Sequence, residues 1–153
     1  MPKKIIKTKP VEKKVKAPAR AKKAKYTYAV GRRKTAKARV RLYRGKGETV
    51  VNGKPIGEYF VGEVAKIAYL KPFTAIESEG KFYATIKVEG SGNRSQLEAA
   101  VLGLARALDK ENNSLYHSAL SKNKLLTRDP RARERRKPGQ MGRARKKKQS
   151  PKR

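Results

Sequence analysis

The amino-acid sequence predicts an α+β fold of two layers, in which helices cover one face of a four-stranded sheet and both ends of the chain are extended. Residues 36–43 alternate between small or apolar and basic side chains, as a half-buried strand does. Residues 95–108 carry apolar side chains at helical spacing. Strands come first and helices are interspersed among them, an order that favours a single sheet covered on one face.

Charge divides the chain into three parts. Residues 1–25 contain 11 basic and 1 acidic residue, residues 26–127 contain 18 and 9, and residues 128–153 contain 13 and 2. Only the middle part has enough apolar residues to offset the entropy lost on folding. We therefore expect a globular domain over residues 26–127, a disordered basic extension before it and an extended basic tail after it. The net charge of +30 repels itself unless a polyanion screens it, so an anionic partner is implied.

Four segments are predicted to be strands. In the first, even positions are small or apolar and most odd positions are basic. A turn over residues 44–47 leads to a short second strand, and Asn52 with Gly53 marks the tight turn after it. Gly80 is a turn residue between the last two strands. The strands are expected at residues 36–43, 49–51, 73–76 and 81–88.

Three segments are predicted to be helices. The first, residues 58–70, has helical spacing and ends before Pro72. Ser95 and Glu98 match a capping box at the start of the longest helix, and a shorter helix is expected at residues 115–120. The longest helix has an apolar stripe that consists of Leu97, Val101, Leu104, Ala105 and Leu108.

Residues 32–46 form a basic strip. They hold 8 of the 18 basic residues of the middle part and no acidic residue. The alternation places Lys37, Arg39 and Arg41 together on one face of the first strand. An ordinary solvated strand face is the alternative, but such a face mixes charges of both signs. The single sign favours binding to nucleic acid.

The strip opens with the motif Gly-Arg-Arg-Lys-Thr. We interpret Gly31 as giving the backbone freedom beside a phosphate. Arg32 and Arg33 each present a planar fork to phosphate, and Lys34 adds a point charge. Such a motif is common in basic proteins and is only moderately specific.

A glycine-containing loop, residues 90–96, precedes the longest helix. Free amide groups at a helix start attract phosphate, and Arg94 adds a positive charge there. A flexible loop with a helix cap is the alternative. The loop does not match a nucleotide-binding motif, because no Gly-Lys-Ser or Gly-Lys-Thr closes it.

The C-terminal tail is the most informative segment. Its 26 residues reach on the order of 90 Å when extended, so the tail can contact a site far from its own domain. A solubility tag or a localisation signal is the alternative.

Several classes of protein are disfavoured. The chain has no Cys and a single His, His117, which we place on a helix surface, so no catalytic or metal-binding set is visible. No stretch reaches the roughly 18 apolar residues of a membrane span, and the basic segments lack the apolar face of a membrane-surface helix. The N-terminal residues fit neither a secretory signal nor a transit peptide, so we expect an intracellular protein. No cofactor is expected.

Several separate motifs in the same order resemble one known family. They are YAVGRRKTAKARV from Tyr28, VNGKP from Val51 followed by Tyr59 and Phe60, LLTRDPR from Leu125 and SPKR from Ser150. Together these segments resemble the universal small-subunit ribosomal protein nine family of bacterial type. The sequence departs from the family pattern in the loop at residues 90–96, at Pro138 and at Pro151.

The resemblance implies a compact domain with a left-handed β-α-β crossover, an exception to the right-handed rule. It implies that the protein sits on ribosomal RNA in the head of the small subunit of the cytoplasmic ribosome, beside other ribosomal proteins and away from membranes. The end of the tail is implied to contact peptidyl-site tRNA through Ser150, Lys152 and Arg153. The resemblance and the charge pattern together assign ribosomal RNA contacts to Arg32, Arg33, Lys34, Lys37, Arg39, Arg41, Arg94, Arg128, Arg131, Arg133, Arg135, Arg136, Lys137, Arg143 and Arg145.

Two other hypotheses remain open. Ends rich in Lys, Ala and Pro are also typical of a histone-like protein that compacts DNA. A comparison of binding to structured RNA and to duplex DNA at matched salt separates the RNA-binding hypothesis from the histone-like one, because A-form shape and 2′-hydroxyl contacts favour RNA. An enzymatic function rests on analogy of fold alone.

Overall fold

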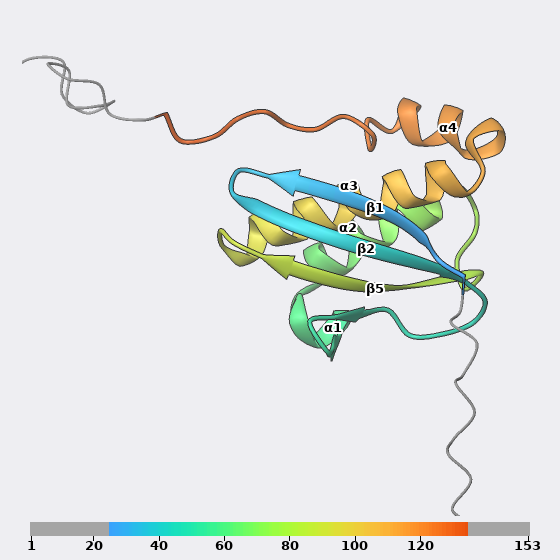
Figure 1. Cartoon of the computed structure of the whole chain (residues 1–153), viewed down its shortest axis with the longest axis horizontal. Helices are drawn as coiled ribbons and strands as arrows, with labels where there is room; N and C mark the ends of the chain where they lie inside the picture. Colours follow the sequence, from blue (N-terminus) through green and yellow to red (C-terminus); the bar gives the residue numbers. More distant parts are fainter. Residues whose placement is uncertain (1–24, 135–153) are drawn as a thin grey trace, which may run out of the picture.

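A computed structural model describes residues 25–134 and shows a sheet on one layer of helices (Figure 1). The strands are β1 (Thr27–Arg33), β2 (Ala36–Arg44), β3 (Val50–Val51), β4 (Lys54–Pro55) and β5 (Phe82–Glu89). The helices are α1 (Ile56–Tyr59), α2 (Glu63–Thr74), α3 (Asn93–Glu111) and α4 (Asn113–Lys122). The sheet is mixed, in the order β1-β2-β5-β3-β4. The two-layer α+β architecture is thus as predicted, but with five strands in place of four.

The chain crosses between parallel strands once in the described residues. β3 and β5 are parallel neighbours, whereas every other neighbouring pair in the sheet is antiparallel. The chain leaves β3, forms the β3–β4 hairpin and passes through α1 and α2 before it enters β5. This is a β-α-β crossover, as expected, and its left-handedness stays a prediction.

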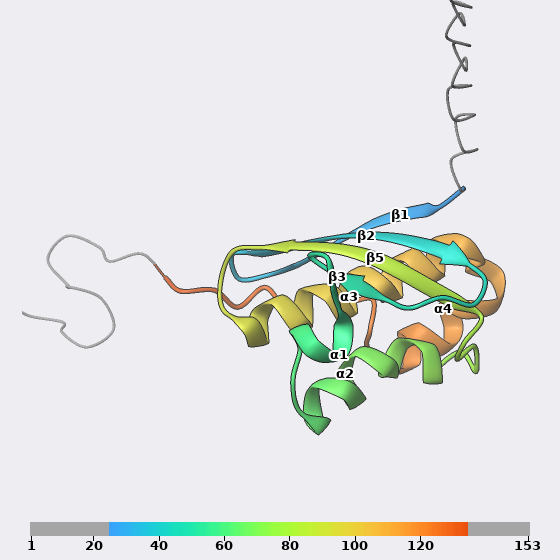
Figure 2. The ribbon, with the colours of Figure 1, turned by 90° about the horizontal axis from the view of Figure 1, so that it is seen from below.

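The four helices of residues 25–134 all cover the same face of the sheet. Seen along its edge in Figure 2, the sheet lies on one side and all four helices lie on the other. In β2, Ala38 and Val40 are fully buried against this layer, while the alternating residues Lys37, Arg39 and Arg41 are exposed. The alternation predicted for this strand is therefore confirmed, and no helix of the described part of the chain covers the face to which its basic side chains point.

The longest helix packs as its apolar stripe predicts. Leu104, Ala105 and Leu108 are fully buried in the core, and Leu97 and Val101 pack at its margin. The expected capping box is wrong. α3 begins at Asn93 with Gly92 at its N-cap, and its first turn has no side-chain cap. Ser95 is buried inside the helix, and Glu98 pairs with another residue, described below.

The region between β4 and β5 corrects two predictions. The helix expected at residues 58–70 is two helices, which separate at Gly62, where φ is +109°, a value that L side chains rarely adopt. The strand expected at residues 73–76 does not form, because α2 continues through Pro72 to Thr74. Proline removes one hydrogen bond from a helix. Here the helix persists for two more residues because Pro72 and Phe73 are buried.

Other local predictions are confirmed. Asn52 and Gly53 have φ of +49° and +84°, as a tight hairpin turn requires. The Asn52 side chain also bonds both the N–H and the carbonyl of Val88, at 2.9 Å each, and so ties this turn to β5. Gly80 has φ of +75° before β5. The short helix expected at residues 115–120 is part of α4.

The sequence prediction missed β1, which contains Gly31. A Cβ atom added to Gly31 would lie 1.9 Å from the carbonyl oxygen of Ala99 and 2.5 Å from the backbone nitrogen of Gly103, both in α3. Gly31 therefore faces the helix, and our interpretation of it as a residue beside phosphate is wrong. Its missing side chain lets α3 cross β1 at backbone distance.

We predict that Gly31→Ala lowers the free energy of unfolding by about 3 kcal/mol, the upper end of the range for overpacking, because its new methyl group meets backbone. Gly57→Ala is the matched control. The nearest atom to its Cβ is the Tyr69 hydroxyl at 3.9 Å, an ordinary contact. Urea unfolding followed by circular dichroism measures both. Equal midpoints for Gly31→Ala and the parent protein would contradict the close crossing.

Candidate nucleic-acid interface

The sheet face opposite the helices, here called the open face, carries basic side chains. Lys37 and Arg39 of β2 point to it. Strand pairing places Arg32 of β1 opposite Lys37, and Lys87 of β5 opposite Arg39. Like charges directly opposite each other destabilise a sheet. Glu89 pairs with Arg39 at 2.8 Å, but both side chains are half exposed, and such a pair contributes little.

Tyrosines occupy one end of the open face. The rings of Tyr43 and Tyr83 stack with centroids 5.0 Å apart and planes 13° apart. Tyr26 lies beside Tyr43, at 5.8 Å between centroids. The guanidinium carbon of Arg41 lies 5.3 Å from the Tyr26 ring centroid, a cation–π contact. Cationic and aromatic side chains together can contact both the phosphates and the bases of RNA.

The structure brings two of the predicted motifs together at the other end of the sheet. The β1–β2 turn contains Lys34, which is exposed with φ of +50°. The loop before α3 packs against this turn, since a Cβ atom on Gly90 would lie 2.6 Å from the carbonyl oxygen of Thr35. The Arg94 side chain is 93% exposed, with its Nε 3.7 Å from a carboxylate oxygen of Glu98. This end of the molecule thus presents cations from both motifs.

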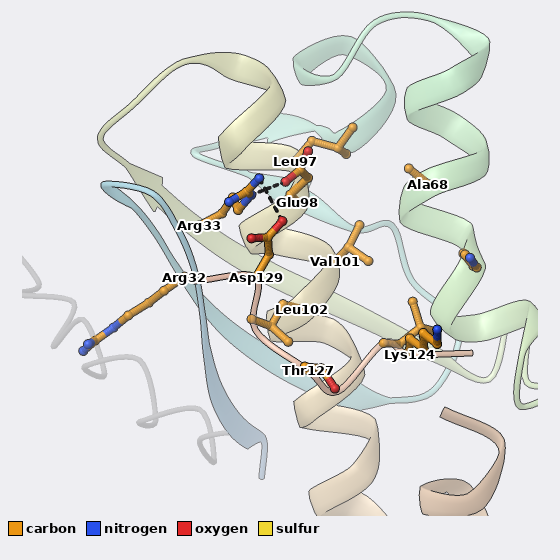
Figure 3. Close-up of a pocket in the computed structure, with 12 residues that line it drawn as sticks. Arg32, Arg33, Ala68, Leu97, Glu98, Val101, Leu102, Lys124, Thr127 and Asp129 are labelled. Atoms are coloured by element: carbon orange, nitrogen blue, oxygen red, sulfur yellow. Dashed lines mark hydrogen bonds and ion pairs between the residues drawn. The ribbon is translucent and has the colours of Figure 1, made fainter. Parts of the chain in front are cut away.

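Arg33 points into the protein and fastens the start of the C-terminal tail. It is only 8% exposed. Its Nε donates to Glu98 of α3 at 2.5 Å, its Nη2 pairs with Asp129 at 3.0 Å, and its Nη1 donates to the Arg131 carbonyl at 2.7 Å. Figure 3 shows dashed lines from Arg33 to both carboxylates, whereas Arg32 extends away from them. This cluster, here called the Arg33 clamp, gives Arg33 a structural role, so we remove it from the proposed RNA contacts.

Hydrogen bonds hold the clamp carboxylate ionised. The side chain and the backbone N–H of Arg131 both donate to Asp129. These bonds, together with the positive charges of Arg131 and Arg33, hold the pKa of Asp129 well below its usual range. The pKa of the Arg131 guanidinium is raised in turn. Asp129 and Arg131 therefore both keep their charges at all ordinary pH values.

Basic side chains also line the outer edge of β1. Arg106 and Lys110 of α3 donate to the β1 carbonyls of Val30 and Tyr28, each at 3.2 Å. They cover carbonyls that an edge strand otherwise leaves open to another chain. A hollow of about 510 Å³ at this edge is lined by Val30, Arg32, Arg106 and Arg128. Three cations from three separate parts of the chain thus meet in one place.

Comparison with known proteins decides the family. The family model for ribosomal protein S9/S16 matches residues 31–153. The chain belongs to the ribosomal protein S9/S16 family. It is 48% identical over 121 residues to the small ribosomal subunit protein uS9 of Dehalococcoides mccartyi, an alignment that covers 79% of this chain and 90% of the relative. It is 46% identical over 112 residues to uS9 of Thermus thermophilus, covering 73% and 87%.

Membership of the S9/S16 family confirms the resemblance drawn from the motifs. The family consists of ribosomal proteins, which are structural, so the expectation that this chain is not an enzyme is also confirmed. Among residues 25–134, no group of three or more His, Cys, Asp or Glu side chains is placed to hold a metal ion. His117 is exposed on α4, with its Nδ1 2.9 Å from Asp109, as expected of a surface residue. No helix in the described part is long and apolar enough to cross a membrane.

The described residues include only part of the predicted RNA-binding set of this S9/S16 chain. Arg32, Lys37, Arg39 and Arg41 lie on the open face, whereas Lys34 lies in the β1–β2 turn and Arg94 in the first turn of α3. Arg128, Arg131 and Arg133 lie on the segment that runs past β1 and α3 without helix or strand (Figure 1). The other tail positions, Arg135, Arg136, Lys137, Arg143, Arg145, Ser150, Lys152 and Arg153, lie outside the described residues. Residues 1–24 lie outside them too.

Sequence reasoning missed three cations of this surface. Lys87 shares the open face because β5 pairs with β2, and its signal was the alternation of β5 itself. Arg106 and Lys110 are four residues apart on α3, away from its apolar stripe, so each resembles an ordinary solvated helix residue. Their position at the β1 edge depends on where α3 crosses the sheet.

We predict that Asp129→Asn loosens the tail at Arg131, because a neutral amide replaces the carboxylate shared by Arg33 and Arg131. Hydrogen exchange at the Arg131 N–H, which donates to Asp129 at 2.9 Å, should be faster than in the parent protein. Glu63→Gln, which neutralises a carboxylate of α2, is the control.

The difference between the parent protein and Asp129→Asn should depend on pH in one direction. A depressed pKa contributes stability above the pKa of the unfolded state, ~3.9, and that stability is lost as pH falls through the folded value. The ratio of the Arg131 N–H exchange rate in Asp129→Asn to that in the parent protein should therefore stay constant from pH 7 to pH 4. It should shrink only in stronger acid. A ratio of one at pH 7 would refute the clamp.

Proposed function

We propose that this S9/S16 protein binds ribosomal RNA in the head of the small subunit through its open face and tail, and contacts peptidyl-site tRNA through Ser150, Lys152 and Arg153. The chain is a structural constituent of the small ribosomal subunit, as its family membership establishes. We further propose neighbouring ribosomal proteins of the head as its other partners and the cytoplasmic ribosome as its location.

The open face is the observation that carries the RNA-binding proposal. Three adjacent strands present five basic side chains, and none of the helices within residues 25–134 covers them. These are Arg32, Lys37, Arg39, Arg41 and Lys87. The sheet keeps opposed like charges that cost folding free energy. A polyanion relieves this repulsion, and phosphate contacts position a protein on RNA without reading its sequence. The same layer of charge suits a protein whose partner is a fixed, folded RNA.

The tail carries the tRNA proposal. The Arg33 clamp fixes the tail at Asp129 and Arg131, so the chain leaves the domain from a defined point. Residues 132–153 contain 11 basic residues and 1 acidic residue, and the last two of the basic residues are Lys152 and Arg153. Contact with tRNA phosphates through these two cations would be electrostatic, which steadies the tRNA independently of its sequence.

We predict that Lys37→Gln with Arg39→Gln weakens binding of the full chain to a transcript of the head domain of small-subunit ribosomal RNA. The slope of log affinity against log salt should fall in magnitude by about 0.7 to 0.9 for each phosphate that the variant no longer neutralises. The stability of the free protein should stay equal or increase, because the opposed pairs Arg32–Lys37 and Arg39–Lys87 are removed.

Lys66→Gln with Lys122→Gln is the matched control, since it removes two exposed cations from α2 and α4 in the helical layer. Filter binding over a range of salt concentrations measures both variants. Duplex DNA at the same salt tests the histone-like hypothesis. Binding that is equally tight to DNA and RNA, or equally weakened in test and control variants, would contradict RNA binding by the open face.

We predict that removing Lys152 and Arg153 lowers the affinity of small subunits for peptidyl-site tRNA and leaves subunit assembly intact, because only the tip of the tail is removed. Small subunits are reconstituted with the shortened chain, with the parent chain or with the Lys66→Gln plus Lys122→Gln variant. Their tRNA retention and their sedimentation are then compared. Unchanged tRNA retention would refute the assignment of the tail end, while leaving RNA binding by the domain untouched.

A further inference from the structure

The hollow at the β1 edge differs from every other cluster of charge in the described residues. Arg32 comes from β1, Arg106 from α3 and Arg128 from the tail, and these three residues with Val30 line it. We call these three side chains the arginine notch. Guanidinium groups carry their charge at all ordinary pH values, so three of them around one space repel each other unless an anion lies between them.

Carboxylates neutralise most other arginines, but not those of the notch. Arg33, Arg39, Arg44, Arg94 and Arg131 each form an ion pair with a carboxylate. Within residues 25–134, no such pair involves Arg32, Arg106 or Arg128. The clamp carboxylate is next to Arg128 in sequence, yet Asp129 turns to Arg33 and Arg131. The fold therefore directs the carboxylate that is adjacent to Arg128 in sequence towards Arg33 and Arg131.

One hydrogen-bond donor of the notch is buried and unsatisfied. The Nε of Arg128 has almost no exposed surface and no hydrogen-bond partner among the described residues. A buried charged donor without a partner costs more than the usual penalty for a neutral one. The Arg106 guanidinium, in contrast, has a partner within the protein, since its Nη1 donates to the Val30 carbonyl at 3.2 Å. That bond holds the group in place and leaves its other donors for a ligand.

We propose that the arginine notch binds one phosphate of the RNA backbone. The proposal rests on the proposed function, because it names where one phosphate of that RNA sits. A phosphodiester carries the negative charge that the notch lacks, and its oxygens accept the paired hydrogen bonds that a guanidinium fork donates. Arg32 and Arg33 then divide two tasks between consecutive positions of β1. Arg32 would face the phosphate, whereas Arg33 is buried and holds Asp129 and Arg131 of the tail.

A phosphate in the notch would join three parts of the molecule. It would bridge the edge strand, the long helix and the first residue of the tail. Arg128 is adjacent to the Asp129 of the Arg33 clamp, so both ends of this junction would be fixed, one by protein and one by RNA. The tail would thus leave the domain in a direction set by the bound RNA.

The test uses the full chain and the transcript of the head domain of small-subunit ribosomal RNA. Arg128→Gln and Arg106→Gln are made singly and together, with Lys66→Gln plus Lys122→Gln as the control of equal charge. Each single variant should weaken binding about tenfold, as for loss of a hydrogen bond to a charged group. The double variant should lose less than the product of the two single losses, because both side chains hold one shared phosphate.

Phosphate-ethylation interference on the transcript identifies the contact directly. At one phosphate, ethylation should weaken the complex of the parent protein and of the control variant but add nothing to the loss in the double variant. Circular dichroism checks folding, and Arg128→Gln keeps the test valid if Arg106→Gln disturbs β1. The proposal fails if the notch variants bind like the control, or if every interfering phosphate interferes equally with the double variant. If the parent chain binds the transcript no more tightly than duplex DNA at the same salt, the proposed function is overturned instead.

Discussion

The backbone contact between α3 and β1 positions everything else in this structure. At Gly31 the helix lies so close to the strand that no Cβ atom fits between them. Because of this crossing, α3 covers one sheet face and leaves the other open. It also places Glu98 beside Arg33, and brings Arg106 and Lys110 to the carbonyls of the edge strand. The open face, the Arg33 clamp and the basic edge of β1 therefore all depend on this one close packing contact.

Charges in the domain are separated by where their partners lie. Two carboxylates of α3 bind residues of the strands: Glu98 pairs with Arg33, while Glu111 accepts hydrogen bonds from Thr27 and Arg44. The bond from Thr27, followed by the effects of Arg44 and Lys25, lowers the pKa of Glu111. Since these acids hold the strands to the helix, little negative charge remains for the open face or the notch. Outside residues 32–46 the domain has 10 basic and 9 acidic residues, so most of its excess positive charge can in this way lie on one surface.

The open face was predictable, whereas β1 and the capping of α3 were not. In β2, the alternation of Ala38 and Val40 with Lys37 and Arg39 is a local pattern, and it fixed which side chains point outward. Gly31 interrupts the same pattern in β1, because a residue without a side chain is neither apolar nor polar. Ser95 and Glu98 matched a capping box, yet Glu98 binds Arg33 instead. A partner 65 residues away in sequence outcompeted the local one.

By itself, the sequence determined the family, the two-layer fold class and the basic face, since each depends on short motifs, composition or a repeat of two residues. Tertiary structure decided which arginines serve the protein and which are left for a ligand. Arg32 and Arg33 are chemically identical neighbours, but strand pleating turns one outward and the other towards Glu98 and Asp129. Likewise, Arg106 and Arg128 meet Arg32 only because the helix and the tail pass the same edge of the sheet. Electrostatic partners depend on distance in space, which no local pattern encodes.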